Sequence, residues 1–131
     1  EKATARMAAQ RANPKDIARI EAALQTLEAS MQARTPSFDA DYQFHRAIAA
    51  ASGNEVFIRM LDCARESIEQ GIDVAQKLTR EGSQARIDVV INEHRQILEA
   101  IRAGDSEVAG VSMAYHLLQA RTRITDHAGI A

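Results

Sequence analysis

Apolar residues recur at intervals of three and four along almost the whole chain, the spacing that places side chains on one face of an α-helix. One such series predicts an amphipathic helix over residues 14–34 and consists of Ile17, Ile20, Leu24, Leu27 and Met31. Later series predict helices over 37–51 and 55–81, a helix between the break at 81–83 and the stop at 104–105, and a last helix after it. Residues 1–12 also have a helical pattern. Because no segment alternates apolar and polar residues over the length of a strand, the pattern predicts an all-α protein.

The breaks between these segments carry the residues that helices prefer at their ends. Asn13 precedes Pro14, which combines an N-cap side chain with a proline in the first helical turn. Glycine can adopt the left-handed backbone that ends a helix, and a small polar residue can cap the next one. Residues of these two kinds stand at Gly53 and Gly104, and at Ser37, Asn54 and Asp105.

Five or six helices joined by loops this short favour an antiparallel bundle. No helix is apolar on every side, so the apolar faces must be turned toward one another. In the last helix the apolar series comprises Val108, Val111, Tyr115 and Leu118. We therefore expect these four side chains in the core.

The composition narrows the class of protein. The 131 residues fit one domain, and 46% apolar with 26% charged residues is ordinary for a globular protein. A net charge of −2 argues against a free-standing nucleic-acid binder, so we interpret Arg121 and Arg123 as solvated helix surface. Cys63 is the single cysteine, which excludes an intrachain disulfide, and no apolar run is long enough to span a membrane. A cytoplasmic location is expected.

Four residues of the kind that bind metals fall on inward-facing positions. Asp41 and His45 are four residues apart, so they lie one turn apart on a helix face that also holds Phe38 and Ile48. His94 occupies a core position in its apolar series. His116 lies at the edge of the apolar face of the last helix, in the row that contains Ala109, Ser112, Met113 and Ala120. Three helices therefore project imidazole or carboxylate groups toward one interior.

Two interpretations of these four residues are open. A histidine on an apolar face is commonly a core residue that forms a hydrogen bond to a carbonyl or carboxylate, and Asp41 is a ready partner for His45. Burying all four without partners costs several kcal/mol, about 2–7 for each unpaired polar group, and a shared divalent ion would satisfy them together. Three imidazoles and one carboxylate suit zinc, with nickel or manganese as alternatives.

The motifs around these residues resemble those of a known family. The segment Asp41-Tyr42-Gln43-Phe44-His45, followed by Ser52-Gly53-Asn54, resembles the D-x-x-F-H…SGN signature of the FCD domain. Glu93-His94-Arg95, followed by Ile97-Leu98, Ala100-Ile101 and Gly104-Asp105, resembles its second signature. Met113-Ala114-Tyr115-His116-Leu117 resembles its third. FCD domains are the C-terminal effector-binding domains of the FadR subfamily of GntR-type transcription regulators.

The resemblance carries several expectations. In the metal-binding branch of the family an Asp and three His hold the ion, and the matching residues are Asp41, His45, His94 and His116. The fold is expected to be an antiparallel bundle of six to seven helices that forms homodimers. Operator DNA would be bound only through a winged helix-turn-helix domain that this sequence lacks. Residues 1–12 would end the helical connection to that domain, 13–127 would form the effector-binding bundle and 128–131 a tail.

The resemblance also implies a small organic or sugar acid as the effector, bound at the metal to change DNA binding by the intact dimer. Arg65 shares a helical row with Ile58, Leu61 and Ile68, so its guanidinium is a candidate partner for the effector carboxylate, together with Asn92. The alternative for Arg65 is a surface side chain that pairs with a neighbouring glutamate, and for Asn92 a surface amide.

Two other classes of protein compete with a sensor: a hydrolase-like metalloenzyme and a helical bundle with a purely structural metal. An enzyme would need a general base near the metal. Glu93 adjoins His94 but points about 100° away around the helix, so we expect it to support packing or a cap elsewhere. No Glu-x-x-His pair precedes the three inward histidines. We therefore expect no enzyme.

Overall fold

The computed structural model describes residues 1–127, except for the side chains at positions 71, 72, 75, 79 and 127. The predicted tail at 128–131 lies outside the described residues. Within the described range the chain forms helices joined by short turns, with no strand, which confirms the all-α prediction. The helices are α1 (Lys2–Arg11), α2 (Pro14–Gln32), α3 (Phe38–Ala51), α4 (Glu55–Cys63), α5 (Arg65–Glu81), α6 (Gln84–Arg102) and α7 (Ser106–His127).

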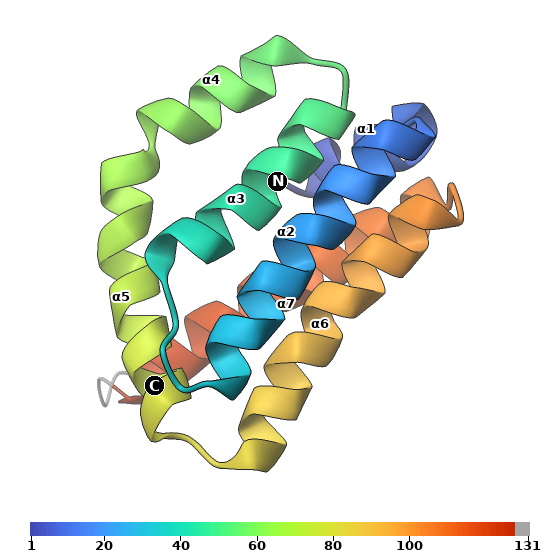
Figure 1. The fold of residues 1–131 in the computed structure, drawn as a ribbon. Coiled ribbons are helices and arrows are strands. Elements are labelled where there is room, and N and C mark those ends of the chain that lie inside the picture. The colour runs from blue at the N-terminus through green and yellow to red at the C-terminus, as the bar shows by residue number, and fades with distance from the viewer. Residues whose placement is uncertain (128–131) are drawn as a thin grey trace.

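The helices form an antiparallel bundle (Figure 1). Helices α3 and α6 lie on either side of α2 and run in the opposite direction to it, and α7 lies behind them. Helix α1 packs against α7 and α3 at one end of the bundle. Helices α4 and α5 follow the outer side of α3, and α5 reaches α7. The core of the bundle is formed mainly by α2, α3 and α6, with large buried side chains at Ile20, Leu27, Phe44, Ile48, Ile87, Ile97 and Ile101.

The predicted helix caps are confirmed. Asn13 Oδ1 accepts a hydrogen bond from the Asp16 amide at 2.8 Å, and Asp16 Oδ2 accepts one from the Asn13 amide at 3.0 Å. At the starts of α3, α4 and α7, the side chains of Ser37, Asn54 and Asp105 each accept one hydrogen bond from a backbone amide. Gly53 and Gly104 have φ of 69° and 71°, the left-handed conformation that glycine adopts without strain.

Helix α1 belongs to the bundle rather than to a connection that precedes it. Its Thr4, Ala5, Ala8 and Ala9 are buried, and it contacts α3, α6 and α7. These small side chains allow α1 to approach α7 closely: a methyl group added at Gly110 of α7 would lie 2.7 Å from Arg6 Cγ. Residues 2–11 therefore pack as part of the bundle.

The single helix predicted over 55–81 is wrong, because the chain turns at Ala64 between α4 and α5. The end of α4 is held on α3 through Asp62, which accepts hydrogen bonds from Tyr42 and Arg46. The chain beyond it turns to pack on α7. Two different packing partners for the two halves account for the bend.

The predicted core face of α7 is also wrong. Val108, Val111, Tyr115 and Leu118 are exposed, whereas the buried face carries Ala109, Met113 and His116. Helix α7 is covered by α1 as well as by α6, so only small residues such as Ala109 and Gly110 fit on its buried face where the helices pack closely.

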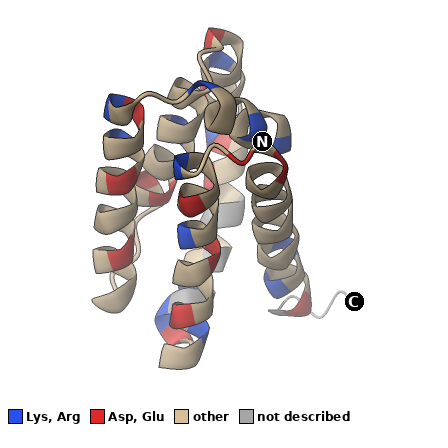
Figure 2. Cartoon of the chain, turned by 90° about the vertical axis from the view of Figure 1, so that its right-hand side faces the viewer, with Lys and Arg blue, Asp and Glu red and all other residues tan. Residues whose placement is uncertain are grey.

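Basic and acidic residues are interspersed along the helices (Figure 2). None of the helices in the described part of the chain is long and apolar enough to cross a membrane.

Candidate metal centre

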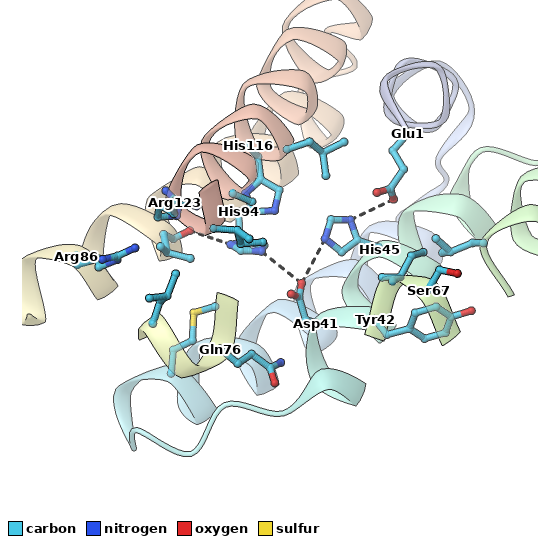
Figure 3. Close-up of a pocket in the computed structure, with 18 residues that line it drawn as sticks. Glu1, Asp41, Tyr42, His45, Ser67, Gln76, Arg86, His94, His116 and Arg123 are labelled. Carbon is cyan, nitrogen blue, oxygen red and sulfur yellow. Dashed lines mark hydrogen bonds and ion pairs between the residues drawn. The ribbon is translucent and has the colours of Figure 1, made fainter. Parts of the chain in front are cut away.

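A cavity of about 260 Å³ lies between α3, α5, α6 and α7. Apolar side chains such as Met31, Leu61, Ile68 and Val90 form much of its wall, and the N-terminal Glu1 also borders it. Figure 3 shows the polar side chains that lie around this cavity. Three histidines and Asp41 come together on one side of it.

Asp41 and His45 lie one turn apart on α3, as predicted. The side chain of His45 is 9% exposed and that of Asp41 17%. The Oδ1 atom of Asp41 is 3.3 Å from Nε2 of His45 and 3.7 Å from Nε2 of His94. One carboxylate oxygen therefore faces imidazoles from two helices.

His94 on α6 is fixed by its own helix. Its Nδ1 is 2.8 Å from the carbonyl oxygen of Val90, so this nitrogen donates a hydrogen bond and carries the proton. Nε2 is then the free nitrogen, and it points toward Asp41. The ring is almost fully buried and packs edge to face against Phe44.

His116 on α7 is oriented by a buried carboxylate. Its Nδ1 is 3.0 Å from Oε1 of Glu93, and Glu93 also accepts two hydrogen bonds from the guanidinium of Arg123, each of 2.9 Å. Glu93 is 4% exposed, so this is a buried ion pair with a histidine attached. The arrangement directs Nδ1–H of His116 to Glu93 and leaves Nε2 available.

The three imidazoles converge. One nitrogen from each of His45, His94 and His116 lies within 4.8 Å of the others, and all three residues are buried. The rings of His94 and His116 are 4.2 Å apart between centroids. Among the described residues, Oδ1 of Asp41 and Nε2 of His94 are buried and have no aligned hydrogen-bond partner.

The local charges set the protonation of the cluster. Burial by itself would raise the pKa of Asp41, but His45 and His94 hold this pKa well below its ordinary value. Burial opposes the charged form of His45, whereas Glu1 and Asp41 raise the pKa of His45 well above its usual value. Burial and the neighbouring His94 lower the pKa of His116 to about 4. Asp41 is therefore ionised and His116 neutral near pH 7.

Glu1 contributes a second carboxylate to the cluster. Its Oε1 lies 3.2 Å from Nδ1 of His45, on the opposite side of that ring from Asp41. Burial opposes ionisation of Glu1, but His45 lowers its pKa to about 2. His45 is thus placed between two carboxylates from different helix ends.

These residues fit a divalent metal ion. Three imidazole nitrogens and one carboxylate oxygen are a donor set that zinc and related ions accept. The unpaired Oδ1 of Asp41 and Nε2 of His94 are atoms whose burial would otherwise cost free energy. The hydrogen bonds from Nδ1 of His94 and His116 also correspond to the outer partners that orient metal-binding histidines.

Comparison with known proteins identifies the family. Residues 1–119 match the family described as the FCD domain. The chain belongs to the FCD domain family. The resemblance inferred from the three motifs is therefore confirmed, and with it the helical fold.

Two curated relatives are transcription regulators. This FCD domain is 33% identical over 109 residues to the galactonate operon transcriptional repressor of Escherichia coli strain K12, which covers 83% of the chain and 46% of that protein. It is 26% identical over 113 residues to the HTH-type transcriptional regulator LutR of Bacillus subtilis strain 168, covering 86% of the chain and 52% of LutR. The chain spans about half the length of these relatives.

A solved structure has the same fold. The structure of McbR/YncC from E. coli superposes with a TM-score of 0.80 over 97% of this FCD domain and 59% of that chain. The sequence identity is 17%, so the likeness concerns the fold alone.

The structure separates the other two predicted site residues from the cavity. Arg65 begins α5, lies over the ring of Tyr42 at 4.6 Å from its centroid, and pairs with Asp39 at 3.5 Å. The turn at Ala64 breaks the helical row that Arg65 was expected to share. Asn92 is exposed and lines a separate surface hollow between α6 and α7. Neither residue borders the cavity beside the histidines.

Sequence reasoning missed three residues of the site. Glu93 was assigned to packing or a cap elsewhere, and Arg123 to the solvated surface, yet the two form the buried pair that holds His116. The spacing of both residues indicated an inward-facing position. Glu93 is three residues after Val90 and four before Ile97, and Arg123 is seven residues after His116. Glu1 gave no signal, because it precedes the first helix.

Proposed function

We propose that this FCD domain is the effector-sensing domain of a bacterial GntR-family transcription regulator and that it binds one divalent metal ion, zinc before nickel or manganese. Asp41, His45, His94 and His116 are the proposed ligands. The observation that carries the proposal is their convergence from α3, α6 and α7, with buried atoms that have no hydrogen-bond partner in the part of the chain that the structure describes.

The cavity beside these ligands is the proposed effector site. Bound there, the ion supplies positive charge and coordination positions that a carboxylate can occupy. Arg86 and Gln76 line the same cavity, and Nε2 of Gln76 is a buried donor without a partner among the described residues. These groups favour an anionic, hydroxylated ligand. A small organic or sugar acid fits this chemistry, and galactonate is the acid in the name of one relative.

The proposed output is a change in DNA binding by a longer, dimeric protein. LutR is described as an HTH-type regulator, which supports a DNA-binding helix-turn-helix domain in the full-length protein. An acid bound between α3, α5, α6 and α7 contacts helices that pack on α1, and we propose that α1 transmits the change. The role is regulatory, and no enzymatic activity is proposed.

The metal site is tested by metal content. We expect about one equivalent of a divalent metal per chain by plasma mass spectrometry, because four buried donors bind far more tightly than surface groups. The double substitution Asp41→Ala, His94→Ala should abolish it. Asp39→Ala is the matched control, since Asp39 is an exposed carboxylate on the same helix. Absence of metal in the native protein after reloading with zinc, nickel and manganese would refute the site.

The effector site is tested by calorimetry with sugar acids on the zinc-loaded protein. We expect saturable binding of an aldonic acid such as galactonate, and weaker binding by Arg86→Ala with unchanged metal content. A metal-loaded protein that binds none of a broad panel of acids would indicate a purely structural metal. Turnover of esters or phosphates would indicate an enzyme instead.

A further inference from the structure

Helix α7 carries an apolar stripe on its outer face. The stripe consists of Val108, Val111, Tyr115 and Leu118, which are 48%, 61%, 51% and 56% exposed. Val89 of α6 is 55% exposed, and it lines the same surface hollow as Val111 and Tyr115. Four apolar side chains in one helical row, continued onto a neighbouring helix, are more than the scattered apolar residues of an ordinary surface.

The stripe has the same spacing from either end. Its members are separated by three, four and three residues. If a second copy of α7 packed against the first in the opposite direction, Val108 would lie level with Leu118 of the second copy, and Val111 with Tyr115 of the second copy. A surface that matches itself after a two-fold rotation is the requirement for the interface of a symmetric dimer.

The charges beside the stripe favour the same arrangement. Glu107 and Arg121 are both exposed, lie fourteen residues apart at opposite ends of the stripe, and fall within about 40° of each other around the helix. They therefore flank the stripe on one side. Antiparallel packing brings Glu107 of each copy toward Arg121 of the other. Parallel two-fold packing would instead place the charged residues of the two copies on opposite sides of the stripe, where they could not pair.

We propose that the α7 stripe, together with Val89, is the interface on which a second copy of this chain docks with its α7 antiparallel. The inference names the surface for the dimer included in the proposed function. The interface does not depend on the metal ion, so the proposed interface and the proposed metal site can fail separately.

Sedimentation equilibrium of the 131-residue chain tests the interface. The native chain should be a dimer, and Val111→Glu with Leu118→Glu should weaken dimerisation by more than about tenfold, because two charges per copy would enter the apolar contact. Met60→Glu is the matched control: Met60 is 61% exposed on α4, outside the stripe, and its substitution should leave the dimer intact. Circular dichroism and metal content should stay unchanged in both variants.

A charge exchange tests the direction of packing at two exposed positions. Glu107→Arg and Arg121→Glu should each weaken the dimer several-fold, because each substitution removes the exposed ion pair at both ends of the interface. The double variant should restore the dimer. A native chain that stays monomeric at all concentrations, or Val111→Glu, Leu118→Glu dimers as tight as those of Met60→Glu, would overturn the interface. Failure of the double exchange to restore dimerisation would overturn the antiparallel direction.

Discussion

At the scale of single residues, Glu93 controls which nitrogen of His116 faces the cavity. A neutral imidazole carries its proton on either nitrogen, and the carboxylate of Glu93 selects Nδ1 for that proton. Arg123 in turn keeps Glu93 ionised within the protein interior. Burial opposes its charge, but His116 and Arg123 lower the pKa of Glu93 to about 2.

Glu93→Gln is therefore expected to destabilise the metal-free protein in a pH-dependent manner. A carboxyl group with a lowered pKa stabilises the fold above its ordinary pKa of 4.5, and this contribution is lost as the pH falls toward 2. The difference in unfolding free energy between the native protein and the variant should be on the order of 2–3 kcal/mol at pH 7 and shrink below pH 4.5. Urea denaturation at several pH values measures it. A difference that does not change with pH would contradict this role.

The same residues show how far the sequence can predict a site. The spacing of Asp41 and His45 is a local property of one helix, so their shared face could be predicted and is confirmed. The pairing of Glu93 with Arg123 depends on how α7 is rotated against α6, which the periodicity of a single helix does not determine. Arg65 was misplaced because one turn at Ala64 changes the direction of every side chain after it.

At the scale of elements, the contact of α1 with α7 depends on small side chains. Ala5 and Ala8 of α1 are fully buried, as is Ala109 of α7. Residues this small are poor indicators of a buried face in a sequence, since alanine is common on both surfaces and interiors. The core position of α1, and the outward direction of the larger residues of α7, therefore escaped prediction.

Ala8→Leu should strongly weaken this contact. The larger side chain has no space between α1 and its neighbours, and overpacking of a close-packed interior typically costs about 1–3 kcal/mol. Ala3→Leu is the matched control, because Ala3 lies on the same helix and is exposed. Thermal denaturation should show a lower Tm for Ala8→Leu alone. Equal Tm values for both variants would mean that α1 does not pack as described.

At the scale of the whole molecule, the candidate metal centre joins three helices that are distant in sequence. Asp41 and His45 lie on α3, His94 on α6 and His116 on α7. An ion bound to all of them would link these helices in the folded state only, and it would raise stability by mass action. The helical class of the fold and the positions of the helix caps could be predicted, because apolar periodicity and capping residues recur many times along the chain.

Zinc addition is accordingly expected to raise the Tm, and acid to reduce the effect. Glu1 and Asp41 raise the pKa of His45, so below that pKa a metal ion must displace its proton. Each proton displaced lowers the apparent metal affinity by up to about tenfold per unit fall in pH. The Tm increase with zinc, measured by calorimetry from pH 8 to pH 5, should shrink with acidity and be absent in Asp41→Ala, His94→Ala. A constant increase at every pH would exclude these ligands.

The turn at Ala64 also has a consequence for rates. Leu61, Ile68 and Leu78 of α4 and α5 form one wall of the cavity. These two helices lie along the outer side of α3 (Figure 1). Movement of this wall away from α3 and α7 would widen the way into the cavity. We therefore expect the residence time of a bound effector to depend on how firmly α4 and α5 pack against α3 and α7.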